Sequence, residues 1–184
     1  RPCVAQQSFS YLVTCIALAA KANSEALEDP GKRVVDLINV LPEGSIPESR
    51  AMLKIFEILC NAGTLEMAQE CHRLFQKYSR EIPHIPFSLV LRSYLEAGRK
   101  ETTQERKRLA VKEVLEVFET RWDTNPPRHA EERIAQGAGV LHCIAVSGMS
   151  TDLEIKQAAD MVVRRVVGDS EYPQFHKEAT AVSG

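Results

Sequence analysis

Apolar residues recur along most of the chain at the spacing of one face of an α-helix. The pattern is clear in two segments, one with Leu53, Phe56 and Cys60 and one with Val111, Val114, Leu115, Phe118 and Trp122. No segment alternates between apolar and polar residues in the way a half-buried strand does. The pattern therefore predicts an all-α protein.

Proline and glycine residues fall between these apolar segments and divide them into separate helices. Three S/T-x-x-E pairs predict helix starts by capping boxes, namely Ser45 with Glu48, Thr102 with Glu105, and Thr151 with Glu154. We predict eight helices, near residues 8–22, 31–41, 47–61, 64–80, 85–97, 102–122, 129–147 and 152–167.

The helices pair into a degenerate repeat of about 35 residues. The first helix of each pair ends at Asn23, Gly63, Gly98 or Gly148, and seven residues before these ends lie Ile16, Phe56, Leu91 and Leu141. We expect these four residues to be buried at contacts between helices, because they occupy the same apolar column. A two-helix unit cannot cover its own apolar face, so neighbouring pairs are expected to stack. We predict one α-solenoid domain over residues 1–184, with antiparallel hairpins at 8–41, 47–80, 85–122 and 129–167. In the tail, 168–184, Tyr172 and Phe175 either seal the end of the solenoid or anchor in a partner.

Residues 47–80 resemble a pentatricopeptide repeat. The segment from Gly63 to Ala68, followed by Leu74 and Phe75, is similar to the G-x-L-E-x-A…F segment of that family, and residues 52–63 resemble its first helix. A tetratricopeptide-like or another helical-hairpin array would have a similar pattern. The resemblance implies a right-handed superhelix, a location in the mitochondrion or plastid, and binding of single-stranded RNA.

The positions that would select bases in this family are mostly apolar here. Ten residues before the four helix ends lie Val13, Leu53, Ser88 and Ala138, and the next column holds Thr14, Lys54, Leu89 and Gly139. Only Ser88 or Thr14 could make the usual polar contact to a base. Sequence-specific RNA binding is therefore the alternative function and not the leading one.

Composition and charge indicate an ordinary globular protein. The 184 residues are 44% hydrophobic and 26% charged, with a net charge of −2. The longest apolar stretch, residues 11–20, is far shorter than the ~20 residues that span a bilayer, so we expect no membrane-spanning segment. A local basic excess is a candidate docking patch for RNA or an acidic protein, or the solvated start of a long helix; it contains Arg99, Lys100, Arg106, Lys107, Arg108 and Lys112.

Candidate chemistry is sparse. The pairs Cys71-His72 and His142-Cys143 combine metal-ligand residue types, but adjacent side chains on a helix point about 100° apart, so neither pair forms a bidentate site. No nucleophile, base and orienting group converge. We therefore expect no enzyme activity, metal, cofactor or small-molecule substrate. The sequence favours a non-catalytic helical-repeat scaffold that binds other subunits of an organellar multiprotein complex. The alternative is a pentatricopeptide-type RNA-binding protein in organellar RNA processing or translation.

Overall fold

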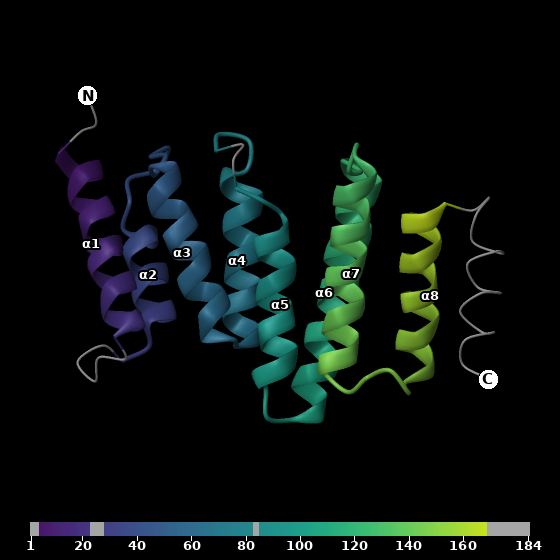
Figure 1. The fold of residues 1–184 in the computed structure, drawn as a ribbon. Helices are drawn as coiled ribbons and strands as arrows, with labels where there is room; N and C mark the ends of the chain where they lie inside the picture. The colour runs from purple at the N-terminus through teal and green to yellow at the C-terminus, as the bar shows by residue number, and fades with distance from the viewer. Residues whose placement is uncertain (1–3, 23–27, 83–84, 169–184) are drawn as a thin grey trace. The chain divides into compact units, whose positions relative to one another are not determined.

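The computed structural model describes residues 4–22, 28–82 and 85–168. Within these ranges the chain forms eight α-helices and no strand, which confirms the all-α prediction (Figure 1). The helices are α1 (Val4–Lys21), α2 (Pro30–Asn39), α3 (Ser49–Ala62), α4 (Leu65–Tyr78), α5 (Ser88–Lys100), α6 (Gln104–Thr124), α7 (Ala130–Val146) and α8 (Leu153–Val167). Tyr172 and Phe175 of the tail lie outside the described residues.

The chain divides into two compact units, Arg1–Glu101 and Thr102–Gly184. Helices α1 to α5 belong to unit 1, and α6 to α8 belong to unit 2. The predicted hairpin at 85–122 spans this boundary, because α5 lies in unit 1 and α6 in unit 2. Each unit is described by itself below.

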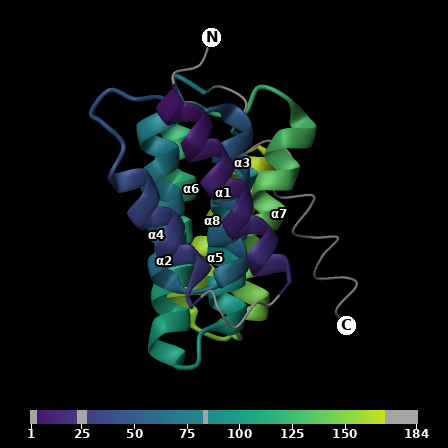
Figure 2. The same cartoon turned by 90° about the vertical axis from the view of Figure 1, so that its left-hand side faces the viewer.

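Unit 1 consists of two rows of helices. Helix α3 packs against both α1 and α5, and α2 packs against α4, so α1, α3 and α5 form one row and α2 and α4 the other (Figures 1 and 2). Each helix also contacts its neighbour in sequence. The core of unit 1 lies between the two rows, with α3 at its centre.

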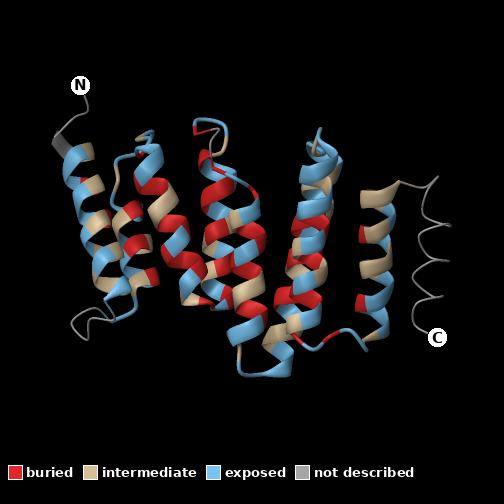
Figure 3. Cartoon of the chain, in the orientation of Figure 1, coloured by how far each residue is buried: buried red, intermediate tan, exposed pale blue. Residues whose placement is uncertain are grey.

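Helix α3 is the most completely buried element of unit 1 (Figure 3). Met52, Ile55 and Phe56 are fully buried, and Leu59 is 1% exposed. These residues lie three or four positions apart and form a wide apolar stripe, which the flanking helices cover. The predicted column residues Phe56 and Leu91 are buried, whereas Ile16 and Leu141 are only half-buried.

In unit 2, α7 packs against both α6 and α8, and α6 also contacts α8. The approach of α7 to α8 is close at Gly137, where a Cβ atom would collide with the Val166 side chain. Buried Ile155 and Val162 of α8 lie on the same face of the helix.

The helix ends confirm some predicted boundaries and correct others. Gly63 ends α3 in the left-handed conformation, with φ +68°, and Gly148 follows α7 with φ +73°. Gly98 does not end a helix, because α5 continues to Lys100. All three predicted capping positions are wrong by one to three residues, since the observed N-caps are Glu48, Thr103 and Asp152. The hydroxyl of Thr103 and the carboxylate of Asp152 accept backbone N–H groups at these starts, as capping requires.

In the described part of the chain, every helix is too short or too polar to cross a bilayer.

Candidate interaction surfaces

The six basic residues of the predicted docking patch divide between the two units. Arg99 and Lys100 are at the end of α5 in unit 1. The other four lie on α6 in unit 2, namely Arg106, Lys107, Arg108 and Lys112. They therefore form two groups, and the contacts of each group indicate what it does.

Lys100 stabilises the turn between α3 and α4. Its ammonium group donates a hydrogen bond to the carbonyl oxygen of Asn61 at 2.6 Å, at the end of α3. The carboxylate of Glu101 accepts the backbone N–H of Leu65 at 2.9 Å, at the start of α4. A cation at a helix C-terminus and an anion at a helix N-terminus both complement the helix dipole. Lys100 therefore has a structural role within unit 1, and Arg99 pairs with Glu96 on its own helix at 2.6 Å.

On α6, Arg108 and Lys112 bind the N-terminus of α8. The Arg108 guanidinium donates to Asp152 and to Glu154, each at 2.8 Å, and the Lys112 ammonium donates to Glu154 at 2.9 Å. Asp152 is also the N-cap of α8, where it accepts the N–H groups of residues 154 and 155. These four side chains link the two helices through charge-assisted hydrogen bonds.

The pKa values of this cluster shift in the directions that ion pairing requires. The hydrogen bond from Arg108 lowers the pKa of Asp152, and the hydrogen bond from Lys112 lowers the pKa of Glu154. The hydrogen bond to Asp152 raises the pKa of Arg108. All three groups therefore stay charged, and an anionic ligand would compete with Asp152 and Glu154 for Arg108 and Lys112.

The first six residues of α6, 104–109, are exposed or half-buried. Leu109 is 45% exposed, and burial begins at Ala110 and Val111. Arg106 and Lys107 precede this point and are half-buried.

The cysteine and histidine pairs occupy ordinary helical positions. Cys71 is buried, and the adjacent His72 lies 3.0 Å from the Gln76 amide nitrogen, with its pKa lowered by burial. Cys143 is buried in unit 2, where burial raises its pKa to about 12, while His142 is exposed. Among the residues that the structure describes, no group of three or more His, Cys, Asp or Glu side chains is placed to hold a metal ion.

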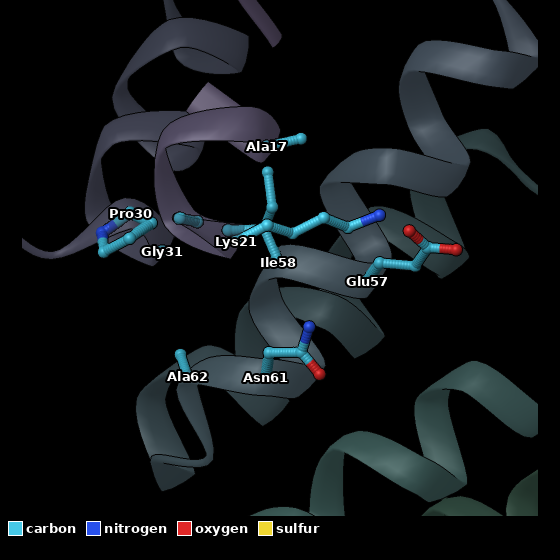
Figure 4. Close-up of a pocket in the computed structure, with 9 residues that line it drawn as sticks. Ala17, Lys21, Pro30, Gly31, Glu57, Ile58, Asn61 and Ala62 are labelled. Atoms are coloured by element: carbon cyan, nitrogen blue, oxygen red, sulfur yellow. The ribbon is translucent and has the colours of Figure 1, made fainter. Parts of the chain in front are cut away.

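A cavity of about 390 Å³ lies in unit 1 between α1, the start of α2 and the end of α3 (Figure 4). Its polar side chains are Lys21, Glu57 and Asn61, and the rest of the lining is apolar or small. Figure 4 shows the Lys21 chain extending toward the side on which the Glu57 carboxylate lies. One cation and one anion leave the cavity without a net charge, so the lining favours no charged class of ligand.

Helix α1 exposes an apolar face. Tyr11 is 71% exposed, Leu12 47% and Leu18 63%, and Cys15 lies exposed between them. These positions recur at helical spacing, and the sequence of α1 contains one charged residue, Lys21 at its end. The opposite face buries Phe9 and Val13 within unit 1. A helix that is apolar on both faces is typical of a buried element, which makes the exposed face a candidate interaction surface.

Sequence reasoning missed the acidic partners of the basic residues. Glu154 was assigned to a capping box with Thr151, and Asp152 had no assigned role. Their pairing with Arg108 joins residues more than 40 positions apart, and only the packing of α6 on α8 brings them together. The uncharged composition of α1, in contrast, is evident in the sequence from residue 11 to residue 20, although its exposure is not.

Comparisons with known proteins give no assignment. The chain matches no family model, and no curated protein sequence or solved structure matches it significantly.

Proposed function

We propose that this protein is a non-catalytic helical-repeat subunit that binds another protein through the exposed face of α1. The observation that carries the proposal is the apolar, uncharged surface made by Tyr11, Leu12, Cys15 and Leu18. A surface of this composition favours contact with another apolar surface over contact with water, phosphate or a charged peptide.

The packing of unit 1 supports a helical partner. In its row, α3 is covered by a helix on each flank, α1 on one side and α5 on the other. Helix α1 has the same kind of apolar face toward its outer flank, so the element that fits it is a further amphipathic helix. We infer that such a helix comes from another subunit and extends the row. This inference includes an α-solenoid of antiparallel hairpins, which the order of helix contacts in unit 1 supports. Its right-handed superhelix is carried over from the family resemblance alone.

The compartment remains an expectation from the family resemblance. We propose an organellar multiprotein complex, in the mitochondrion or plastid, as the setting of this contact.

The test is a double substitution, Tyr11→Lys with Leu18→Lys, in the tagged full chain. The matched control is Val40→Lys, because Val40 is 76% exposed in unit 1 and belongs to the end of α2 and not to α1. A protein that co-purifies in fixed proportion with the wild type at high salt should be lost from the double variant and kept by the control. Retention of the same partner by the double variant would reject the proposal. A purified wild type that is dimeric while the double variant is monomeric would assign the surface to a second copy instead.

The alternative function, binding of single-stranded RNA, predicts a different result. RNA binding through phosphate contacts should weaken steeply with salt. The double variant Arg106→Glu with Lys107→Glu tests it without breaking the pairs that Arg108 and Lys112 make with α8. On our proposal the wild type binds RNA weakly at physiological salt. Strong wild-type binding that this variant abolishes, with the α1 variant unaffected, would establish the alternative.

A further inference from the structure

Two buried thiols approach the same backbone carbonyl group where three helices of unit 1 meet. Cys60 lies near the end of α3, Cys71 lies in α4, and both side chains are fully buried. Both sulfur atoms point to the carbonyl oxygen of Leu89 in the first turn of α5, at 3.3 Å from Cys60 and 3.9 Å from Cys71. Because both sulfur atoms reach one oxygen atom, the two thiols lie close together in the core.

The surroundings of the two sulfur atoms make them chemically unequal. The hydrogen bond from Cys71 lowers the pKa of the Cys60 thiol, and the positive charge of Arg92 acts in the same direction against the effect of burial. Burial raises the pKa of Cys71 well above its usual value. Cys60 is therefore the thiol that forms a thiolate more readily, and the thiolate is the nucleophilic form of cysteine.

We propose that Cys60 and Cys71 are an oxidation site, at which a hydroperoxide converts the thiol pair into a reversible disulfide between α3 and α4. Both sulfur atoms lie within 3.9 Å of one carbonyl oxygen, and a disulfide requires them to approach each other to a bond length of about 2 Å. The turn between the two helices is short, running from Gly63 to Thr64, so the disulfide would join neighbouring segments without moving distant elements.

The reaction with hydrogen peroxide balances in two steps. The Cys60 thiolate attacks one oxygen, the O–O bond breaks, and hydroxide leaves, so that Cys60 becomes a sulfenic acid and the peroxide is reduced. The Cys71 sulfur then attacks the Cys60 sulfur, its proton passes to the departing hydroxyl group, and the S–O bond breaks with loss of water. In sum, two thiols and one peroxide give one disulfide and two waters. A dithiol reductant reverses the change by thiol–disulfide exchange.

Access to the pair requires a local opening, because both sulfur atoms are buried. Oxidation of the pair should therefore be slower than oxidation of Cys15, which is exposed on α1. Cys143 in unit 2 is also buried, and burial raises its pKa to about 12. It therefore rarely forms a thiolate and should be the less reactive of the buried thiols.

The test uses the full chain with Cys3→Ser, Cys15→Ser and Cys143→Ser, treated with hydrogen peroxide in the folded state. Trypsin releases residues 55–73 as one peptide that holds both Cys60 and Cys71. After alkylation under denaturing conditions, this peptide should be two hydrogens lighter than the reduced form and carry no alkyl group. Cleavage after Glu66 and Glu70 should leave the fragments joined, and a dithiol should separate them.

Two results would overturn the proposal. One is full alkylation of both cysteines after treatment of the folded protein. The other is a disulfide that forms only after unfolding in urea, which would show that the folded contact does not promote the reaction.

The order of attack has its own test. In Cys71→Ser, whose hydroxyl keeps a hydrogen-bond donor beside Cys60, the sulfenic acid on Cys60 should persist and react with dimedone, whereas Cys60→Ala should leave Cys71 unlabelled. Dimedone labelling of Cys71 in the Cys60→Ala variant would overturn the assignment of Cys60 as the attacking thiol. Far-UV circular dichroism verifies that both variants are folded.

Discussion

Helices α1 and α3 lie in the same row of unit 1 and are both rich in apolar residues, but their surroundings differ. Helix α3 has α1 on one flank and α5 on the other, and it buries Met52, Ile55 and Phe56 completely. Helix α1 has α3 on one flank, and on its outer face Tyr11 and Leu18 are more than half exposed. Figure 3 shows this contrast as red segments along α3 and pale blue and tan segments along most of α1.

The difference shows that apolar composition and burial report separate properties. Composition reflects the surfaces that a helix is suited to contact, whereas burial reflects the neighbours that are present. On α3 the two agree, so α3 stabilises the folded unit. On α1 they disagree on one face, so that face contributes little to the stability of unit 1 and is available for binding.

The largest expected effect is the loss of a core side chain from α3. Phe56→Ala should lower the free energy of unfolding by about 3–5 kcal/mol, because Phe56 is fully buried and its truncation leaves a cavity in the core. Ile16→Ala, at the equivalent position of α1, should cost only about 1 kcal/mol because Ile16 is half-buried. Urea denaturation of the isolated protein measures both.

The same comparison extends to the other two members of the repeat column. Leu91→Ala should behave as Phe56→Ala does, at about 2–5 kcal/mol, since Leu91 is 3% exposed. Leu141→Ala should cost as little as Ile16→Ala, about 1 kcal/mol, because Leu141 is half-buried. Equal costs at all four positions would mean that the four helices are equally enclosed, which would remove the contrast between α1 and α3.

Local periodicity was sufficient to predict the helices. The spacing of apolar residues gave all eight elements, with boundaries within a few residues, because each depends on one face of a single helix. Burial of the column was predicted correctly at Phe56 and Leu91, which both lie in unit 1. It failed at Ile16 and Leu141, because the repeat pattern gives the helix face but not whether a neighbour covers it.

The contacts at the candidate sites could not be predicted from local sequence patterns, because they join residues on different helices. Lys100 and Arg108 were correctly identified as part of a basic segment, but their partners lie 39 and 44 residues away in the chain. The approach of Cys60 and Cys71 to the same carbonyl group of Leu89 was missed because each cysteine fitted an apolar column by itself. In all three cases the sequence identifies the residue type, and the packing of two helices determines the contact.

An intermediate effect is expected at the end of α3. Gly63→Ala should cost about 2–3 kcal/mol, because an L-residue in the left-handed region costs roughly 1–2 kcal/mol and the new methyl group displaces Lys100 from Asn61. Gly148→Ala is the matched control, since Gly148 has a similar φ of +73° but open space around its Cβ position. It should cost about 1–2 kcal/mol from the backbone alone. A Gly63→Ala cost no larger than that of Gly148→Ala would show that the Lys100 contact does not stabilise the turn.

The smallest expected effect is on the exposed face of α1. Leu18→Lys should change the free energy of unfolding of the isolated protein by less than about 0.5 kcal/mol, because the side chain is 63% exposed and the new charge lies near the C-terminus of its helix. The same substitution should weaken the complex with the proposed partner, where Leu18 would be enclosed by a second helix. The two measurements together distinguish a binding surface from a stabilising one. A loss of more than about 1 kcal/mol in the isolated chain would mean that this face is already covered within the protein, and α1 would then resemble α3.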